Sequence, residues 1–464
     1  MIVDTLAFLL PEITLIILSF GLLTNSMTAY EGKRVVNKAM LVAGAILSIL
    51  FIFKTQDGLY LNATFENNPT TKIIKFLLVS SSLFSLLFVS NSKTDQLKKY
   101  FDEYCFLLVL SLVGGMFVVS SREFFSLILS VELLSIPLYI ISGMGPHPSK
   151  SIEAATKLFL FGTVSTVCLI FSAVLFYSFS GSTYFIDINW ASTDYVVILA
   201  SIFLVATISF KCALYPFHFW IADTYESAPI NMLPFLSTIP KISTIGFLLF
   251  FFRNLTLDLD NQVIIVVLFV SLVSIIFGSI LTIRQNNLLR LLAYSGIPHV
   301  GIMLIGIMVP NSISSDFLVL YFTFYTFANV GLYVCLNSLP KANEDYRLDK
   351  LNSLYKNSPL LAMSISCFLL SLAGTPLLGG FWGKFNIALI SYKTYGLFLP
   401  SLILISTLIS FYYYLRIIKA IFGDNRPSQS ENINFSIVNK IIIVICVFIT
   451  VLLGLHPNIL AVLI

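Results

Sequence analysis

Long apolar runs, separated by short polar breaks, follow one another along nearly the whole chain of 464 residues. A helix needs about 20 mostly apolar residues to cross a bilayer, and most of the runs are near that length. Only 11% of the residues are charged, whereas an ordinary soluble domain carries roughly 25%. The alternating pattern of a membrane β-barrel is absent from the sequence. The sequence therefore predicts an all-α polytopic membrane protein.

Counting the runs predicts about 14 transmembrane helices, two of which contain helix-breaking residues. The seventh carries Pro216. The twelfth is too long for one straight span, and its breaking residues are Gly374, Pro376, Gly379 and Gly380. Proline interrupts helices, and transporters use interrupted helices near the bilayer midplane. We therefore predict that helices 7 and 12 are broken. The expected spans are 5–24, 38–53, 73–90, 104–120, 124–142, 154–178, 196–220, 230–252, 262–283, 289–309, 315–338, 359–392, 396–420 and 437–455.

Charge and cysteine content exclude several classes of protein. The net charge is only +4, and the basic residues form no stripe that would bind a phosphate backbone, which excludes nucleic acid as a partner. The six cysteines lie singly, mostly inside apolar runs. Their spacing argues against a disulfide framework, an iron–sulfur cluster or a metal site in this chain.

The lysines and arginines of the loops lie mostly in the loops that follow odd-numbered spans. Short loops on the inner side of a membrane are enriched in these residues. The sequence therefore predicts that loops after odd-numbered spans face inward and that the first span starts on the outer side.

Among the charged residues inside expected spans, four carry the main functional signal, and these are Glu132, Lys211, Lys241 and Lys384. A charge at the bilayer centre costs at least about 2.5–3.5 kcal/mol, so such residues usually face a bundle interior, a water-filled path or a partner. A static ion pair would explain Glu132 and Lys211, but one acid cannot neutralise three lysines. A buried lysine whose carboxylate partner moves away can release its proton near neutral pH, which favours a titratable chain. We predict that Glu132 pairs with Lys211 in the resting state.

His299, in the tenth expected span, lies between these lysines in the sequence. A histidine changes its charge at physiological pH and can relay a proton. A membrane histidine can equally be a hydrogen-bonded packing residue. Both interpretations of His299 stay open at the level of sequence.

The spacing of these residues suggests an internal repeat. Lys211 follows Glu132 by 79 residues, and Lys384 follows His299 by 85. Two successive units of five helices would be inverted relative to each other, which is a common transporter plan. We therefore predict two inverted five-helix repeats. The expected segments are 1–103 with three helices, 104–253 with the first repeat, 254–420 with the second repeat and 421–464 with the last helix.

Several motifs carry a resemblance to a known family. FKCALYPFHFWIADTYESAP (210–229) resembles the seventh-span signature of the antiporter-like subunits of respiratory complex I, the proton-pumping NADH:quinone oxidoreductase. NLLRLLAYSGIPHVG (287–301) is similar to the tenth-span motif of that family, and SLAGTPLLGGFWGKF (371–385) to the twelfth-span motif. Within the family, LLPE (9–12) and a lysine rather than a glutamate at position 384 resemble the branch called subunit 2, or N.

The resemblance implies a central polar axis made by Glu132, Lys211, Lys241 and Lys384. It implies proton translocation coupled to quinone reduction elsewhere in an enzyme complex. Other complex I membrane subunits, including further antiporter-like subunits, and the lipid bilayer are then the partners. NADH, FMN, iron–sulfur clusters and quinone are expected in other subunits, since this sequence has no dinucleotide-binding glycine motif and no cysteine cluster.

Two other functions are compatible with the sequence. The chain could belong to a multisubunit cation/proton antiporter or a membrane-bound hydrogenase built on the same motifs, or it could be a structural membrane spacer whose polar axis is silent. The 42 Phe and 21 Tyr residues, together with frequent Ile, Asn and Lys, are typical of AT-rich genomes. This composition favours the mitochondrial inner membrane over a bacterial plasma membrane.

Overall fold

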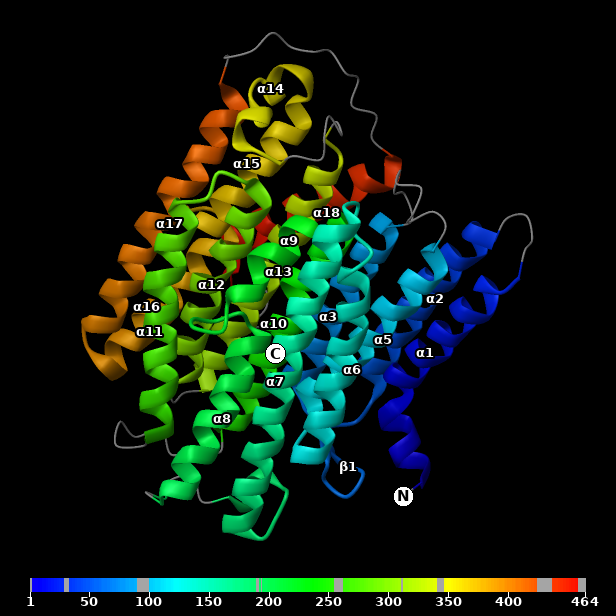
Figure 1. The fold of residues 1–464 in the computed structure, drawn as a ribbon, viewed down its shortest axis with the longest axis vertical. Helices are drawn as coiled ribbons and strands as arrows, with labels where there is room; N and C mark the ends of the chain where they lie inside the picture. Colours follow the sequence, from blue (N-terminus) through cyan, green and yellow to red (C-terminus); the bar gives the residue numbers. More distant parts are fainter. Residues whose placement is uncertain are drawn as a thin grey trace. The chain divides into compact units, whose positions relative to one another are not determined.

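The fold is almost entirely helical (Figure 1). The computed structural model describes residues 2–28, 33–89, 100–188, 194–253, 262–309, 312–339, 346–423 and 436–457, together with Ser192. These residues contain 17 α-helices, a few 3-10 turns and one antiparallel hairpin of two strands, β1 (Gly58–Tyr60) and β2 (Phe65–Asn67). A helix satisfies its backbone polar groups internally, which a bilayer requires of any chain that crosses it.

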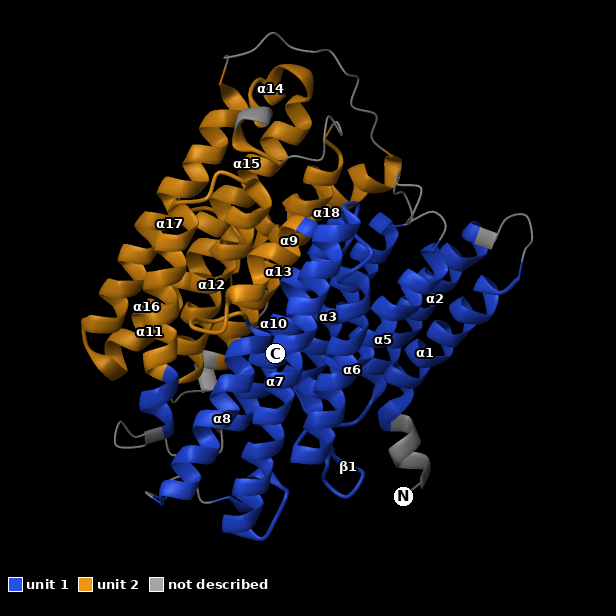
Figure 2. Ribbon diagram, viewed as in Figure 1, with its two compact units in different colours: residues 1–212, 227–267 blue, residues 213–226, 268–464 orange. Residues whose placement is uncertain are grey.

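The helices fall into two compact units (Figure 2). Unit 1 comprises Met1–Cys212 and Ser227–Val267, and unit 2 comprises Ala213–Glu226 and Leu268–Ile464. Unit 1 holds α1 (Ile2–Ser26), α2 (Lys33–Lys54), α3 (Pro69–Val89), α5 (Phe101–Ser120), α6 (Phe124–Ser142), α7 (Pro148–Ser180), α8 (Tyr195–Lys211) and α10 (Leu233–Arg253). Unit 2 holds α9 (Phe219–Ser227), α12 (Leu288–Ile307), α13 (Ser312–Asn337), α14 (Leu354–Asn357), α15 (Pro359–Ala373), α16 (Gly379–Tyr395), α17 (Phe398–Phe422) and α18 (Ile437–Leu455). The remaining helix, α11 (Gln262–Ile283), begins in unit 1 and continues in unit 2.

Each unit has a central helix whose side chains are almost all buried. In unit 1, α10 contacts α3, α5 and α8; in unit 2, α13 contacts α12, α15, α16 and α18. Both helices are apolar around most of their circumference, as helices in a bundle core are. In contrast, α2 and α7 leave most of their apolar stretch exposed, as expected for helices that face lipid.

Twelve of the described helices are long and apolar enough to cross a membrane. Two shorter apolar helices, α8 and α15, add to these. Each of these two helices ends where the sequence predicted an interruption. Shorter helices are thus found where the seventh and twelfth spans were expected to break.

The seventh span is interrupted around Pro216. α8 ends at Lys211, α9 begins at Phe219, and the residues between them are not helical. Ala213 adopts a left-handed backbone with φ of 56°, through which a right-handed helix cannot continue. Pro216 lies within this interruption and offers no backbone N–H.

The twelfth span is interrupted between α15 and α16. Gly374 follows the last residue of α15 in a left-handed conformation with φ of 92°. The N–H groups of Gly374 and Thr375 both donate to the carbonyl of Leu370 and close the last turn. Pro376, which cannot continue a helix, comes two residues later.

Gly379 and Gly380 were predicted as part of this break, but both lie in the first turn of α16. Close packing is the physical reason for glycine there. A Cβ atom at Gly380 would lie 1.7 Å from the carbonyl oxygen of Ser371 in α15, and one at Gly379 would lie 3.1 Å from Cβ of Phe324 in α13. Gly383, one turn later, would meet the Phe324 ring at 2.4 Å. These glycines let α13 and α15 approach the backbone of α16.

In unit 1, the loops after the second, fourth and sixth spans meet at one end. A β-bridge joins Phe65 in β2 to Ser121 after α5, and another joins Glu123 to Tyr184 after α7. Arg122 pairs with Glu66 at 2.7 Å. Loops of the same parity therefore gather on one side, as in a chain that crosses a membrane repeatedly. We call this side the hairpin end, because β1 and β2 lie there.

In unit 2, the loops after the ninth, eleventh and thirteenth spans meet in the same way. A β-bridge joins Asn287 to Arg347. Arg416, near the end of α17, donates to the carbonyls of Ile283 and Gln285 at 3.0 and 2.8 Å. The alternation of loops is therefore regular within each unit.

Candidate functional site

Lys211, the last residue of α8, is buried in unit 1, and hydroxyl groups hold its ammonium group. Nζ donates to Oγ of Ser135 at 2.7 Å and to Oη of Tyr139 at 3.3 Å, both on α6. Ser135 in turn donates to the carbonyl of Val131 at 2.6 Å. The lysine residue is only 6% exposed. Neutral oxygen atoms thus replace the water that a charged lysine would otherwise bind.

Glu132 lies on the same face of α6, one turn before Ser135, because residues three or four apart share a helix face. Its carboxylate accepts a hydrogen bond from Oγ1 of Thr166 in α7. No ion pair between Glu132 and Lys211 occurs among the described contacts of either side chain, so the predicted resting-state pair is not formed in this structure. The reason is local: each charge has neutral hydrogen-bonding partners of its own.

Gly162 in α7 makes room for this arrangement. A Cβ atom at Gly162 would lie 2.1 Å from Oη of Tyr139. Thr166, one turn later on α7, donates to the carboxylate of Glu132 and to the carbonyl of Gly162. The same face of α7 therefore positions both the tyrosine that Lys211 contacts and the carboxylate of Glu132.

Lys241 is buried in α10, where it is 2% exposed. α10 contacts α6 and α8, the helices that carry Glu132 and Lys211. Pro240 precedes this lysine inside the helix, and α10 continues past it. Unit 1 therefore places three of the predicted site residues on helices that contact one another.

Lys384 in α16 is held by the end of the broken twelfth span. Nζ donates to the carbonyls of Leu372 at 2.8 Å and Ala373 at 3.1 Å, the last two residues of α15. Oγ of Ser410 in α17 lies 3.5 Å away. Carbonyls in the last turn of a helix lack intrahelical partners, and this end of a helix carries a partial negative charge. The break after α15 therefore supplies the oxygen atoms that a buried lysine needs.

His299 in α12 lies between two tyrosine hydroxyls. Nδ1 is 2.9 Å from Oη of Tyr321 in α13, and Nε2 is 3.5 Å from Oη of Tyr414 in α17. The histidine is 2% exposed. Both ring nitrogens thus face groups that can donate and accept a proton, an arrangement that suits a relay and also a packed, hydrogen-bonded histidine.

One face of α17 connects the surroundings of His299 to those of Lys384. Lys384 approaches Ser410, and His299 approaches Tyr414. Ser410 and Tyr414 are four residues apart, and side chains at this spacing are neighbours on a helix surface. Neither residue was singled out from the sequence, because serine and tyrosine are common in apolar helices and carry no charge that would mark them.

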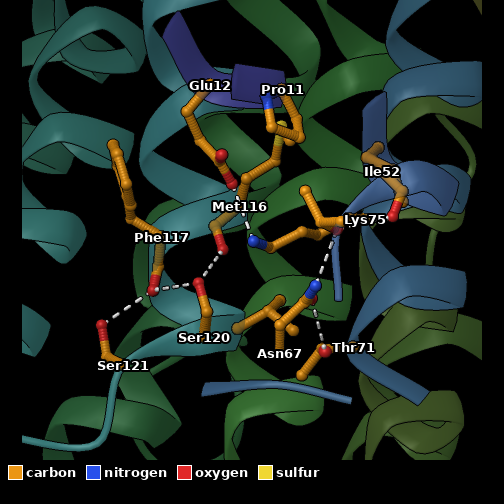
Figure 3. A network of polar contacts seen from close by, with 12 residues as sticks. Pro11, Glu12, Ile52, Asn67, Thr71, Lys75, Met116, Phe117, Ser120 and Ser121 are labelled. Carbon is orange, nitrogen blue, oxygen red and sulfur yellow. Dashed lines mark hydrogen bonds and ion pairs between the residues drawn. The ribbon is translucent and has the colours of Figure 1, made fainter. Parts of the chain in front are cut away.

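A second omission of the sequence-based prediction is the ion pair of Glu12 in α1 with Lys75 in α3 (Figure 3). Nζ and Oε1 are 2.7 Å apart, and the two side chains are 3% exposed for Lys75 and 0% for Glu12. The signal was present, because both residues stand inside expected spans. Glu12 was noted only as part of the LLPE motif, and Lys75, near the start of the third expected span, was not singled out.

The two longest motifs of the sequence meet within unit 2. Arg290, near the start of α12, places Nη1 2.9 Å from Oδ1 of Asp223 and 2.8 Å from Oε2 of Glu226, both in α9. Asn287 caps α12 by accepting hydrogen bonds from the N–H groups of Leu289 and Arg290. The ion pairs of Arg290 attach α9, the second half of the broken seventh span, to the helix that carries His299.

Comparison with known proteins identifies relatives along the whole chain. The family described as NADH:quinone oxidoreductase/Mrp antiporter, transmembrane, matches residues 121–410. NADH-quinone oxidoreductase subunit N of Pelagibacter ubique is 31% identical over 436 residues, which is 92% of each chain. Subunit N 1 of Thermodesulfovibrio yellowstonii is 31% identical over 463 residues, 97% of this chain and 96% of the relative.

Solved structures share the fold. A chain of respiratory complex I from Thermus thermophilus with bound aureothin superimposes with a TM-score of 0.83 at 24% identity, covering 98% of this chain and 99% of the other. A chain of the Mrp complex from Dietzia sp. gives a TM-score of 0.80 at 16% identity, covering 100% and 96%. Since the family match spans more than half of the chain and relatives align with nearly all of it, this membrane protein belongs to the NADH:quinone oxidoreductase/Mrp antiporter transmembrane family.

Proposed function

We propose that this chain is a proton-translocating membrane subunit of an NADH-quinone oxidoreductase, complex I, equivalent to subunit N. Relatives that carry this name align with more than nine-tenths of the chain. The observation that carries the proposal is that Lys211 and Lys384 are held by hydroxyl and carbonyl oxygen atoms. A lysine without a fixed carboxylate partner can change its protonation state as its surroundings change.

In unit 1, the proposed step is a movement of positive charge along one face of α6. The Lys211 ammonium group contacts Ser135 and Tyr139, and Glu132 lies one turn before Ser135 in α6. A swing of Lys211 toward Glu132 would stabilise its charge, and a swing away would favour release of the proton. In this proposal, Lys241 on the neighbouring α10 is the next group in unit 1 to accept the proton.

In unit 2, the proposed path runs from Lys384 past Ser410 and Tyr414 to His299. Hydroxyl groups can pass a proton by accepting one and donating another. The imidazole accepts a proton on one nitrogen and gives one up from the other. The single helical turn between Ser410 and Tyr414 is the gap that the path has to cross.

The redox chemistry belongs, in this proposal, to other subunits of the complex. NADH, FMN, iron–sulfur clusters and quinone are expected there, and this chain contributes the translocase part of the enzyme. Further antiporter-like subunits are the expected membrane partners. The relatives named above are bacterial, which supports a bacterial plasma membrane over a mitochondrial inner membrane.

Neutralising Lys211 tests the proposal. The complex with Lys211→Met, reconstituted in vesicles, should oxidise NADH with much less proton uptake per electron than the parent complex. Lys157→Met is a matched control, because Lys157 is a partly exposed lysine of the same unit that pairs with Glu153. Unchanged proton uptake in the Lys211 variant would contradict the proposal and support a silent membrane spacer.

The second candidate is a subunit of a multisubunit cation/proton antiporter. It is favoured by the whole-length structural match to a chain of the Mrp complex and by the two names in the family description. The proteins that co-purify with the chain distinguish the two candidates. Subunits with flavin and iron–sulfur absorbance support complex I, whereas a complex without redox groups that exchanges cations for protons supports the antiporter.

A further inference from the structure

Glu12 and Lys75 form a buried acid–base pair that none of the steps proposed above uses. The pair joins α1 to α3 in unit 1, with 2.7 Å between Nζ and Oε1. The second carboxylate oxygen, Oε2 of Glu12, is buried and has no hydrogen-bond partner among the described residues. The ammonium group also lies over the ring of Phe8, 4.9 Å from its centroid. Figure 3 shows the two charged groups pointing toward each other between the helices.

Stability alone does not explain this pair. Taking two charges out of water costs about as much as their attraction returns, so a buried ion pair stabilises a fold no better than apolar side chains of the same volume. Such a pair costs least when further hydrogen bonds satisfy its remaining lone pairs. None of the described residues donates one to Oε2 of Glu12. That oxygen atom is therefore a site where the carboxyl group can carry a proton.

A line of polar side chains leads from the pair to the hairpin end of unit 1. Thr71 lies one turn before Lys75 on the same face of α3, and its Oγ1 lies 3.3 Å from Oδ1 of Asn67. Nδ2 of Asn67 donates to Oγ1 of Thr55 at 2.8 Å and to the carbonyl of Gln56 at 3.2 Å. Gln56 is exposed. Polar groups that can hold water thus lie between the face of α3 that carries Lys75 and the surface.

Helix α3 also connects the pair to the core of unit 1. Ile74, next to Lys75, contacts the backbone of α10 at Gly246, where a Cβ atom would lie 3.2 Å from its Cδ1. α10 carries Lys241 five residues earlier. Lys75 and Lys241 therefore lie on helices that pack against each other.

We propose that Glu12 and Lys75 form a second proton-exchange site of unit 1, open to the hairpin end. In the step, an N–H bond of Lys75 breaks and an O–H bond of Glu12 forms, which leaves a neutral amine and a neutral carboxylic acid. The acid then releases its proton to water along the Thr71 and Asn67 side, and the amine takes up a proton from water. The inference rests on the proposed proton-translocating function and adds a site outside the axis of Glu132, Lys211, Lys241 and Lys384.

Infrared difference spectroscopy of the whole complex tests the carboxyl group directly. On addition of NADH, the parent complex should show a carbonyl band of a protonated carboxylic acid. The band should be lost in Glu12→Gln and shifted in Glu12→Asp. The aspartate variant tests the inference if the glutamine variant fails to assemble. Lys72→Met is a matched control, since Lys72 lies on the same helix as Lys75 and pairs with Asp57 at the same distance of 2.7 Å, but near the surface. A band that is identical in the Glu12 variants and the parent would overturn the inference.

Proton uptake separates exchange from a static charge pair. Lys75→Arg keeps the positive charge beside Glu12, but a guanidinium group does not release its proton. The proton-to-electron ratio should therefore fall in Lys75→Arg as it does in Lys75→Met, with Lys72→Met unchanged. A full ratio in the arginine variant would overturn the inference. Failure of the proposed function itself is distinguishable, because Lys211→Met would then retain its ratio as well.

Discussion

At the scale of residues, two buried lysines of the predicted axis, Lys211 and Lys384, are held in the same way. Oxygen atoms without formal charge hold both ammonium groups: hydroxyls of α6 for Lys211 and carbonyls of α15 for Lys384. Such partners stabilise the charged form less than a carboxylate does, and they leave the lysine able to exchange its proton. Removal of the charge and removal of the exchangeable proton should therefore have the same effect on turnover.

Lys384 offers the first test at this scale. Lys384→Ala removes the proton carrier, and Lys384→Arg keeps a charge that does not release its proton. Both variants should lower proton uptake strongly, since loss of a positioned acid–base group slows a proton transfer by about 10²–10⁴-fold. The measurement is proton uptake by reconstituted vesicles alongside NADH oxidation. Full uptake in the arginine variant would leave Lys384 with an electrostatic role only.

Gly162 offers the second test. A methyl group at Gly162→Ala has to displace the Tyr139 hydroxyl, which lies 2.1 Å from the position of its Cβ. Lys211 then loses one of its two acceptors, as it also does in Tyr139→Phe. Hydrogen bonds to charged groups contribute about 1.5–3 kcal/mol, so both variants should reduce proton uptake by roughly tenfold. Gly143→Ala, where the nearest atom is at 3.4 Å, should behave as the parent does.

The sequence identified the charged members of the site but not their partners. A lysine or glutamate inside an apolar run is visible in the sequence, and Glu132, Lys211, Lys241 and Lys384 all lie buried or half-buried in helices. Hydroxyl partners such as Tyr414 carry no such signal, because their role depends on which helices meet. The same limit explains why a direct pair of Glu132 with Lys211 was expected: the sequence shows opposite charges but not the neutral groups around them.

At the scale of elements, the break in the twelfth span connects helix geometry to the site. Gly374 ends α15 in a left-handed conformation and leaves the carbonyls of Leu372 and Ala373 facing Lys384. The break could be predicted from Gly374 and Pro376, because these residues have known backbone restrictions. The place where α16 resumes could not, since Gly379 and Gly380 serve packing contacts that only the assembled helices define.

Gly374→Ala tests this element. A side chain in the left-handed region costs roughly 1–2 kcal/mol, and the new Cβ would lie 3.2 Å from Cδ of Lys384. The variant should lower both the melting temperature and the proton uptake of the complex. Gly396→Ala is the matched control, because its φ is 69° and no atom of the described residues lies within 4 Å of the added Cβ. It should lose stability but keep proton uptake, and equal losses of uptake would argue against a role for the break.

At the scale of the whole molecule, the sequence predicted a many-helix membrane protein, and the part of the chain that the structure describes has 12 helices long enough to span. The division into segments at 104–253 and 254–420, and the assignment of both to inverted repeats, stay predictions. Each of the two compact units holds at least one buried lysine of the predicted axis. Apolar periodicity predicts spans because it reports burial in lipid, but it carries no information on which spans pack together.

Sidedness is the property of the whole molecule that the chain predicts most directly. Basic residues favour the inner side for loops after odd-numbered spans, which places the hairpin of β1 and β2, after the second span, on the outer side. Leu59→Cys, at an exposed position of β1, should react in intact cells with a thiol reagent that cannot cross the membrane. Ser149→Cys, exposed at the start of α7 after the fifth span, should react only after the membrane is opened. The native cysteines are buried or half-buried and give little background. The reverse labelling pattern would invert the orientation, and the proton-exchange pair of Glu12 and Lys75 would then open to the inner side.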